Sequence, residues 1–372
     1  MDLTWAERVA QRNDEVRAAG RWRSVRPLAG GAPATKLHDD GRPVISFASN
    51  DYLGLSQHPT VVAAAHAGLD RDGAGAGAAR LIVGARPVHD ELEAALADWF
   101  DRPAALLFPS GFQANLGVLG ALAACSPETL VLSDELNHAS IIDGCRLARA
   151  PTAVFRHRDV GHLGELLDTH RHRPTIVVTD SVFSMDGDAA PLDDIAQLTR
   201  SHRALLVVDE AHAVLAAPPP PDAVVVGTLS KTLGSVGGFV AAEQSVIDLL
   251  VNSARPFIFT TAGAPADAAA ALAAVRIVAG DEGDVLRARL RRHVDAIAPG
   301  HGSPIVPVVL GEESAALSVS AALLERGLLV PAIRPPTVAP GTCRLRVALS
   351  AAHDDEQVEL LRTALDELGV SP

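Results

Sequence analysis

Residues 205–231 read Leu-Leu-Val-Val-Asp-Glu-Ala-His-Ala-Val-Leu-Ala-Ala-Pro-Pro-Pro-Pro-Asp-Ala-Val-Val-Val-Gly-Thr-Leu-Ser-Lys. This stretch holds two short apolar runs, Leu205–Asp209 and Ala223–Gly227, and polar residues follow each of them. Short apolar runs rich in valine are typical of strands that are buried on both faces of a parallel sheet. The stretch therefore predicts two neighbouring parallel strands with chemically active side chains at their carboxyl ends.

The same pattern extends outward through the middle of the chain. Four more runs predict strands, at Thr129–Ser133, Ala153–Arg156, Thr175–Thr179 and Gly237–Ala242. Helix-like, alanine-rich segments lie between and around these runs, for example Val61–Leu69 and Pro265–Ala279. Strands that alternate with helices predict an α/β domain with a mostly parallel central sheet and helices on both faces.

We divide the chain into three parts. Residues 1–45 predict an N-terminal arm, with a charged helix to about Gly20 followed by a basic stretch. Residues 46–280 carry the alternating pattern and form the large α/β domain. Residues 281–372 hold strand candidates at Ile305–Leu310 and Arg344–Leu349 with helices around them, which predicts a smaller α+β domain.

Composition excludes several classes of protein. The net charge of −13 disfavours a nucleic-acid partner, because a phosphate backbone requires a basic surface. No apolar run reaches the length of a membrane span, and residues 1–7 lack the apolar core of a signal peptide, so we expect a cytoplasmic protein without a membrane partner. The three cysteines, Cys125, Cys145 and Cys343, have no CxxC spacing and argue against disulfides and zinc.

Polar residues of several kinds follow the predicted strands. Asp209 ends one strand and His212 comes one turn later, while Ser184, His138, Thr228 and Lys231 follow other strands. Each has a structural alternative, since a strand-end aspartate often caps a helix and a lone histidine is often structural. Together they place a lysine, an aspartate and two histidines at one edge of the sheet, where open α/β sheets bind their ligands.

This combination suits pyridoxal phosphate. A lysine amine forms a Schiff base with the cofactor's aldehyde, and a carboxylate keeps the pyridine nitrogen protonated. Only two lysines exist in the chain, and Lys36 lies in a surface-strand pattern, so Lys231 is the candidate. A metal site from Asp209, His212, His170 and His172 is the alternative, but His170 and His172 lie among charges and favour a solvated turn; we expect no metal.

The phosphate group of the cofactor needs a binding site of its own. Pro109–Asn115 precedes a predicted helix that runs to about Ala124, and free backbone N–H groups at such a helix start bind anions. An ordinary serine cap explains the same segment equally well. The glycine-rich stretch Gly73–Gly77 resembles a dinucleotide-binding loop, but that motif must follow a strand and Val61–Leu69 predicts a helix.

Several of these segments together resemble the α-oxoamine synthases, which are fold-type-I pyridoxal-phosphate enzymes. The resemblance runs along nearly the whole chain and rests on Ser49–Leu55, Pro109–Asn115, Asn137–Ser140, Asp180–Gly187, Val208–His212, Thr228–Lys231 and Ala332–Arg346. Two features depart from the family pattern. Ala213 stands where relatives carry glycine, and the connection from His212 to Thr228 is shorter and richer in proline.

The resemblance implies a role for each candidate on the cofactor side. Lys231 carries the cofactor and removes the α-proton of the amino acid, Asp209 pairs with the pyridine nitrogen and His138 stacks on the ring. His212 contacts the ring hydroxyl, and Ser184 and Thr228 hold the cofactor. The phosphate is bound by the backbone N–H groups of Gly111 and Phe112, together with Thr261 from a partner subunit.

The resemblance also implies the substrates. Arg346 binds the substrate carboxylate, Asn50 lies near the amino acid, and Thr337 and Arg23 face the acyl group. The segment Arg334–Thr337 favours the branch that condenses L-alanine with a pimeloyl thioester of coenzyme A or of an acyl-carrier protein, in biotin synthesis. Asn137–Gly144 also resembles the glycine C-acetyltransferases, which stay the alternative. The family implies a homodimer with its sites at the interface.

Two other classes stay open at this stage. An aminotransferase shares the lysine and aspartate chemistry but lacks an acyl-side segment such as residues 332–346. The second class is a binding protein without catalytic activity. The colour of an intact cofactor in the purified protein would argue against it.

The short connection predicts a local structure. Only residues 213–222 are free to cross from one strand to the next, and Pro218–Pro221 cannot form the interior of a helix. We expect an extended, helix-free return over one face of the sheet. Such a short connection leaves part of the protein surface uncovered that a longer connection would cover. The site is then either more open than in relatives, or the shortened loop has no effect on the chemistry.

Replacing the two lysines separately tests the assignment of the cofactor lysine. Lys231→Ala should abolish both turnover and the visible absorption band of the lysine-bound cofactor, because no other side-chain amine lies near the site. Lys36→Ala should retain both. Absorption spectra and turnover of the two purified variants provide the measurement, and loss of the band in Lys36→Ala would contradict the assignment.

Overall fold

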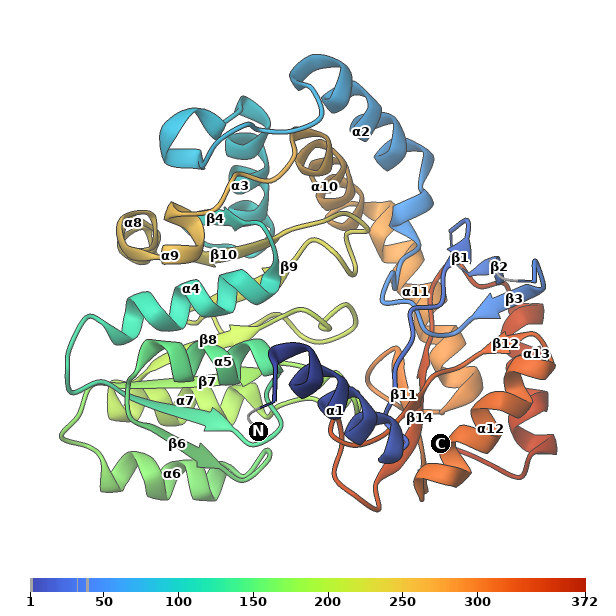
Figure 1. The fold of residues 1–372 in the computed structure, drawn as a ribbon. Helices are drawn as coiled ribbons and strands as arrows, with labels where there is room; N and C mark the ends of the chain where they lie inside the picture. The colour runs from blue at the N-terminus through green and yellow to red at the C-terminus, as the bar shows by residue number, and fades with distance from the viewer. Residues whose placement is uncertain (1–2, 32, 38–39) are drawn as a thin grey trace.

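The architecture is that of a computed structural model, which describes residues 3–31, 33–37 and 40–372 (Figure 1). Five positions of the predicted N-terminal arm, namely Met1, Asp2, Ala32, His38 and Asp39, lie outside the described residues. Within the described part of the chain, no helix is long and apolar enough to cross a membrane.

A seven-stranded sheet forms the centre of the large domain, in the order β4-β10-β9-β8-β7-β5-β6. Its strands are β4 (Ala104–Phe108), β5 (Leu130–Asp134), β6 (Thr152–Phe155), β7 (Thr175–Asp180), β8 (Leu205–Asp209), β9 (Val224–Thr228) and β10 (Gly238–Ala242). Strands β5 to β9 are parallel, whereas β10 runs antiparallel to both β9 and β4. The prediction of a mostly parallel sheet is confirmed, with each predicted strand placed within two residues.

Strand β4 was missed by the sequence analysis. It reads Ala-Ala-Leu-Leu-Phe and lacks β-branched residues, so its composition favours a helix as much as a strand. Pairing with β10 along all five residues makes it a strand, and its end places Pro109 and Ser110 beside the other strand ends.

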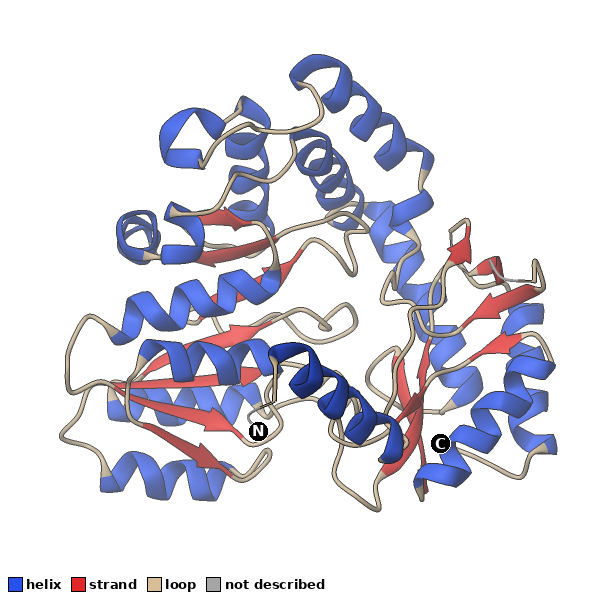
Figure 2. Cartoon of the chain, in the orientation of Figure 1, coloured by secondary structure: helices blue, strands red, loops and turns tan. Residues whose placement is uncertain are grey.

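Helices cover both faces of this sheet, as the alternating pattern predicts (Figure 2). One face packs against α4 (Gly111–Ala123), α5 (Ala139–Ala148), α8 (Gln244–Ser253) and α9 (Arg255–Ile258). The other packs against α6 (Val160–Thr169) and α7 (Leu192–His202) at one end of the sheet and α3 (Pro87–Trp99) and α10 (Pro265–Val278) at the other. The valines of β9 divide accordingly, because Val224 and Val226 face the first set of helices and Val225 faces the second.

Helix α2 (Pro59–Asp72) lies along α10, and the contact depends on a glycine. A β-carbon on Gly68 would lie 2.9 Å from that of Ala269, so only glycine lets the two helices approach this closely. Gly73 ends α2 with a φ of 81°. The glycine-rich stretch 73–77 therefore follows a helix, which confirms that it is not a dinucleotide-binding loop.

The C-terminal region forms a smaller lobe around a three-stranded antiparallel sheet, in the order β11-β14-β13. Its strands are β11 (Ile305–Gly311), β13 (Ala332–Ile333) and β14 (Cys343–Ala348), and its helices are α11 (Asp281–Ile297), α12 (Glu313–Glu325) and α13 (Asp355–Glu367). Both predicted strands are present. All six side chains of β14 are buried, so the strand that carries Arg346 is firmly held.

The N-terminal arm packs against this smaller lobe. After α1 (Trp5–Ala18) come β1 (Leu28–Ala29), β2 (Ala34–Leu37) and β3 (Pro43–Ser46), and β3 pairs in parallel with β12 (Leu328–Leu329). Helix α1, dark blue in Figure 1, lies between the large sheet and the C-terminal lobe in that view. Lys36 is exposed on β2, as expected for a surface strand. The remaining short elements are the 3₁₀ helix Leu55–Gln57 and the π-helical turn Arg80–Gly84.

The connection between β8 and β9 contains no helix in residues 213–222, all of which the structure describes. Two turns interrupt the connection, closed by the bonds from the N–H of Ala216 to the carbonyl of Ala213 at 2.9 Å and from the N–H of Ala223 to the carbonyl of Pro220 at 3.0 Å, so the return is not extended throughout as expected. Val214 and Leu215 pack on the sheet face that also buries Val225. The predicted absence of a helix is confirmed.

Arg102 fixes the far end of this connection. Its side chain is buried and donates to the carbonyl oxygens of Pro220 at 2.6 Å and Ala223 at 3.2 Å. The cation thus gives the carbonyl of Pro220 a second donor beside the N–H of Ala223, and it adds a donor to the carbonyl of Ala223.

Arg102→Met should lower the free energy of unfolding by about 2 kcal/mol, because it removes two charge-assisted hydrogen bonds to the carbonyl groups of Pro220 and Ala223. The matched control is Arg200→Met. Arg200 pairs with Asp222 of the same connection at 2.8 Å but is half exposed, so its loss should cost less than about 1 kcal/mol. Urea unfolding of both variants provides the comparison, and equal losses would show that Arg102 does not anchor the connection.

Candidate active site

The carboxyl ends of three neighbouring parallel strands build the floor of the site. In the registers of β7, β8 and β9, Asp180 lies beside Asp209 and Asp209 lies beside Val226. Thr228 ends β9, and Lys231 follows three residues later. The predicted gathering of these side chains at one edge of the sheet is therefore present.

Lys231 contacts a buried chain of hydrogen-bonding groups. Its Nζ lies 2.7 Å from His212 Nε2, His212 Nδ1 lies 2.6 Å from the hydroxyl of Tyr52, and that hydroxyl donates to Asn50 Oδ1 at 3.1 Å. These contacts join Lys231, His212, Tyr52 and Asn50 into one hydrogen-bonded chain, in which His212 uses both of its ring nitrogens.

Burial and neighbouring cations oppose a positive charge in this part of the site. Burial, followed by the charges of Lys231 and Arg346, lowers the pKa of His212 well below its ordinary value. Burial also lowers the pKa of Lys231, although Asp209 and Asp180 partly oppose that effect. The site thus favours the free amine of Lys231, which is the form that acts as a nucleophile or a base.

Asp209 is buried and held from two sides. Asn115 Nδ2 donates to its Oδ2 at 2.7 Å, and the backbone N–H of Ala211 donates to its Oδ1 at 2.9 Å. Asn115 comes from α4 and also donates to Ser140 Oγ at 2.9 Å. These contacts fix the direction in which the carboxylate faces the site.

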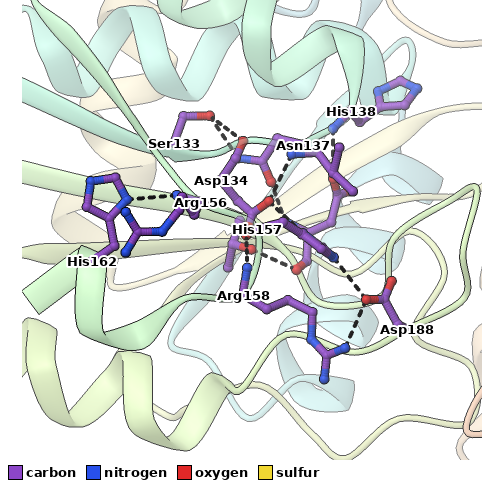
Figure 3. Close-up of polar contacts among 12 residues, drawn as sticks. Ser133, Asp134, Asn137, His138, Arg156, His157, Arg158, His162 and Asp188 are labelled. Atoms are coloured by element: carbon purple, nitrogen blue, oxygen red, sulfur yellow. Dashed lines mark hydrogen bonds and ion pairs between the residues drawn. The ribbon is translucent and has the colours of Figure 1, made fainter. Parts of the chain in front are cut away.

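His138 forms the N-cap of α5, which follows β5, whereas Lys231 follows β9. Its Nδ1 lies 2.7 Å from Ser140 Oγ, and its backbone N–H donates to Asp180 Oδ2 at 2.7 Å. Asn137 holds the same loop, because its amide donates to Ser133 and to the carbonyl of Val178 (Figure 3). The imidazole itself is exposed, as a ring that stacks on a ligand must be.

Asp180 is a buried carboxyl beside a second one. Burial, followed by the charge of Asp209, raises the pKa of Asp180 well above its ordinary value. Of the two neighbouring acids, Asp209 is therefore the one placed to act as a carboxylate toward a ligand.

The smaller lobe contributes an arginine to the same site. Arg346 on β14 is buried; its Nε donates to the carbonyl of Ser184 at 2.6 Å and its Nη2 to Asn50 Oδ1 at 3.1 Å. The hydroxyl of Tyr52 lies 3.5 Å from the same Nη2. Arg346 thus contacts Asn50 and Ser184, which lie far from it in the sequence, while the roles expected for these residues stay predictions.

Close backbone packing forms the start of α4. Ser110 caps this helix and accepts from the N–H of Gln113 at 3.2 Å. A β-carbon on Gly238 would lie 2.3 Å from the nitrogen of Gly111, and one on Gly111 would lie 3.2 Å from Cβ of Thr228. Gly111, Gly238 and Thr228 therefore converge at the helix start, where the first N–H groups of α4 point out of the helix.

Three predicted residues lie apart from this cluster. Thr261 is exposed and forms an isolated bridge with Ala79, which leaves its contribution to a partner's site a prediction. Thr337 is exposed and lines a groove of about 620 Å³ together with Ser184 and Arg21. Arg23 is exposed and does not line this groove, whereas Arg21 does; its role stays a prediction.

The sequence analysis missed Tyr52, Asn115 and Asp180 as members of the site. Tyr52 is the only tyrosine of the chain and is fully buried, which is a usable signal because a buried hydroxyl needs partners. Asn115 gave no such signal, whereas Asp180 directly follows the predicted strand Thr175–Thr179. Among the residues that the structure describes, no group of three His, Cys, Asp or Glu side chains could hold a metal ion.

Comparison with known proteins places the chain in a family. Residues 42–365 match the family model of aminotransferase class I and II. The 8-amino-7-oxononanoate synthase of Methylobacterium sp. (strain 4-46) is 50% identical over 362 residues, which cover 95% of this chain and 94% of that one.

Solved structures agree with this placement. A high-resolution structure of SPT with a pyridoxal-phosphate internal aldimine has a TM-score of 0.89 at 29% identity, covering 99% of this chain and 100% of that chain. The 8-amino-7-oxononanoate synthase of Francisella tularensis has a TM-score of 0.72 at 26% identity, covering 88% of this chain and 98% of that one.

The chain therefore belongs to the aminotransferase class I and II family, the class that the fold and the lysine-centred site define. Within it, the chain belongs with the 8-amino-7-oxononanoate synthases, at about half identity over nearly its full length. This membership confirms the resemblance to the α-oxoamine synthases and the fold-type-I architecture.

The site's residues fit the pyridoxal phosphate that this family implies. An amine, a fixed carboxylate and an exposed imidazole lie around one space, and the glycine-lined start of α4 offers N–H groups for a phosphate. Lys231, Asp209 and His138 would hold the aldehyde, the ring nitrogen and the ring face. The backbone of Gly111 and Phe112, with Thr228, would hold the phosphate.

Asp209→Asn should slow exchange of the substrate α-proton by about 10²-fold or more, because an amide cannot stabilise positive charge on the ring nitrogen. Cofactor affinity should fall by a smaller factor. The comparison variant Asn115→Ala keeps the carboxylate and should slow exchange less. Deuterium exchange into L-alanine and cofactor titration measure the two effects, and unchanged exchange in Asp209→Asn would refute the role.

Proposed function

We propose that the protein catalyses the decarboxylative condensation of L-alanine with a pimeloyl thioester, the step that makes 8-amino-7-oxononanoate in biotin synthesis. The observation that carries the proposal is the meeting of Lys231, Asp209 and Arg346 in one site, in a chain half identical to 8-amino-7-oxononanoate synthases. The thioester is that of coenzyme A or of an acyl-carrier protein.

The cofactor supplies one part of the chemistry. When bound, pyridoxal phosphate offers a protonated ring that accepts electron density from the carbon next to the substrate nitrogen. Asp209 keeps that ring protonated, and Asn115 keeps Asp209 in place. His138 covers one ring face, and His212, neutral and hydrogen-bonded to Lys231, lies beside the lysine that carries the cofactor.

Lys231 performs the proton transfer. Its lowered pKa favours the neutral amine that takes the α-proton of L-alanine. Because the chain has only one other lysine, exposed on β2, no second side-chain amine competes for the aldehyde of the cofactor.

Arg346 orients the amino acid. Its planar guanidinium suits a carboxylate, and the bonds of its Nε and Nη2 to Ser184 and Asn50 fix its plane. A carboxylate held there keeps the α-hydrogen of the substrate directed at Lys231. The groove lined by Thr337, Met185 and Arg21 adjoins Ser184 and has room for an acyl chain.

A homodimer completes the proposal. Exposed apolar side chains lie on two segments that adjoin each other, Leu81, Ile82 and Val83 on one and Phe259 on the other. Thr261 follows Phe259 closely and would reach the phosphate of the partner's cofactor.

L-Alanine with pimeloyl-coenzyme A should be the preferred pair of substrates. With pimeloyl-coenzyme A as the thioester, kcat/KM for L-alanine should exceed that for glycine by about 10- to 100-fold, since a pocket built for one more methyl group discriminates to about that extent. Steady-state assays of all four amino acid and thioester combinations provide the test. Preference for glycine with acetyl-coenzyme A would instead assign the protein to the glycine C-acetyltransferases.

A further inference from the structure

His157 lies outside the residues assigned so far, in the loop between β6 and α6 (Figure 3). Its Nδ1 is 2.9 Å from Asp134 Oδ1 and its Nε2 is 2.9 Å from Asp188 Oδ2. The side chain of Asp134 is 1% exposed and those of His157 and Asp188 are about one quarter exposed, so this bridge is largely removed from solvent.

The two contacts determine the charge of the ring. An ionised carboxylate only accepts hydrogen bonds, so each ring nitrogen of His157 must carry a hydrogen, and the ring is an imidazolium. Arg158 supports the same carboxylates through its side chain to Asp188 Oδ2 at 3.0 Å and its backbone N–H to Asp134 Oδ2 at 2.9 Å. The arrangement balances two cations against two carboxylates.

The pKa of His157 agrees with this geometry. Burial alone lowers it, but the hydrogen bonds and charges of Asp134 and Asp188 outweigh burial, so the pKa is raised above the ordinary value. The charged groups that face the ring are Asp134 from β5, Asp188 from the segment after β7, and Arg158 from its own loop.

The bridge joins the two halves of the active site. Asp134 ends β5, and the turn that follows it carries His138. Asp188 lies in the segment 181–190, which carries Ser184, whose carbonyl accepts from Arg346. The ring of His157 also meets the ring of Phe183 edge-on at 4.4 Å, so it contacts the residue next to Ser184 directly.

We propose that His157 is a positioning residue for the reaction, whose imidazolium ties the segment 181–190 to the His138 loop and thereby sets where Arg346 meets the substrate carboxylate. His157 touches neither the cofactor nor the substrate. It acts through Ser184, since a shift of that carbonyl removes the acceptor that holds Nε of Arg346. The proposal rests on the function assigned to Arg346 above.

The sign of the pH dependence follows from the raised pKa. The bridge is complete below the ordinary pKa of histidine, 6.5, and is lost as the pH rises through the higher pKa of His157 in the folded protein. Affinity for L-alanine should therefore fall over the same alkaline range. The effect should be absent from a chain that lacks the imidazolium.

The charge state can be measured in the wild-type holoenzyme. Nitrogen-15 NMR of the histidine rings, assigned by a His157→Gln spectrum, should show both nitrogens of His157 still mostly protonated at pH 6.5, the ordinary pKa of histidine. A neutral ring at that pH would overturn the proposal. Because this readout needs no turnover, it stands whether or not L-alanine is the substrate; a wild-type protein that fails to bind L-alanine would refute the proposed function instead.

A matched pair of variants tests the role in binding. His157→Gln should retain the visible band of the cofactor, raise the dissociation constant for L-alanine about tenfold, as expected for the loss of one charge-assisted contact, and lose the alkaline fall in affinity. The control is His162→Gln. His162 accepts from the backbone N–H of Arg156 at 3.0 Å in the same loop and contacts neither carboxylate, so its variant should keep the wild-type pH profile.

Wild-type affinity with an unchanged pH profile in His157→Gln would overturn the proposal. If that variant does not fold, Asp188→Asn provides the second test. Removing one carboxylate should move both the NMR titration of His157 and the break in L-alanine affinity to lower pH. A break in affinity that stays in place while the NMR titration moves would show that His157 does not position Arg346.

Discussion

The buried carboxylate of Asp209 is the constraint on which the rest of the site depends. The register of β7 and β8 places it beside Asp180, and two carboxylates cannot both stay charged out of water without partners. The repulsion between the two carboxyl groups is reduced because Asp180 and Asp209 have different hydrogen-bond partners. Asp180 accepts from the backbone of His138 and has a raised pKa, while Asp209 receives the amide of Asn115 and lies near the lysine. The alignment of the parallel strands therefore sets two acids side by side, and the raised pKa of Asp180 lessens the repulsion between them.

The site divides its tasks between the two lobes. The cofactor side is built by strand ends and helix starts of the large domain, which are rigid and closely packed around glycines. The substrate side is built by Arg346 of the smaller lobe and by Asn50 and Tyr52, which follow β3. The hydrogen bonds from Lys231 through His212 and Tyr52 join these halves, and the contact between His212 and Tyr52 is buried. A displacement of the smaller lobe would thus be felt at the lysine as well as at the substrate carboxylate.

Local pattern was enough to predict most of the sheet, because buried parallel strands carry valine-rich runs and their ends are marked by polar residues. It failed for β4, whose alanines and leucines become a strand only through pairing with β10. Within the site, residues next to strand ends were predicted from local pattern, Arg346 and Asn50 were predicted only through the family resemblance, and Tyr52 was missed. His212 meets Tyr52 from 160 positions away and Arg346 meets Asn50 from 296 positions away. Asp180 directly follows the predicted strand Thr175–Thr179, which is the signal that identified Asp209, and could have been found in the same way. Nothing in the local sequence of Asn115 distinguishes it from other helix residues.

Strand β3 pairs in parallel with β12, which is synthesised much later, so the order of synthesis affects when this part of the fold can form. Ser46 is made about 280 residues before its partner Leu329 leaves the ribosome, and at about 5–20 residues per second the interval is about 15–60 s. During that time the outer edge of β3 has no strand to cover it, and the loop that must close is among the longest the chain contains. The large domain has all its strands by Ala242 and can form first. The nascent chain therefore acquires its cofactor-binding half well before the arm and the smaller lobe complete the half that reads the substrate.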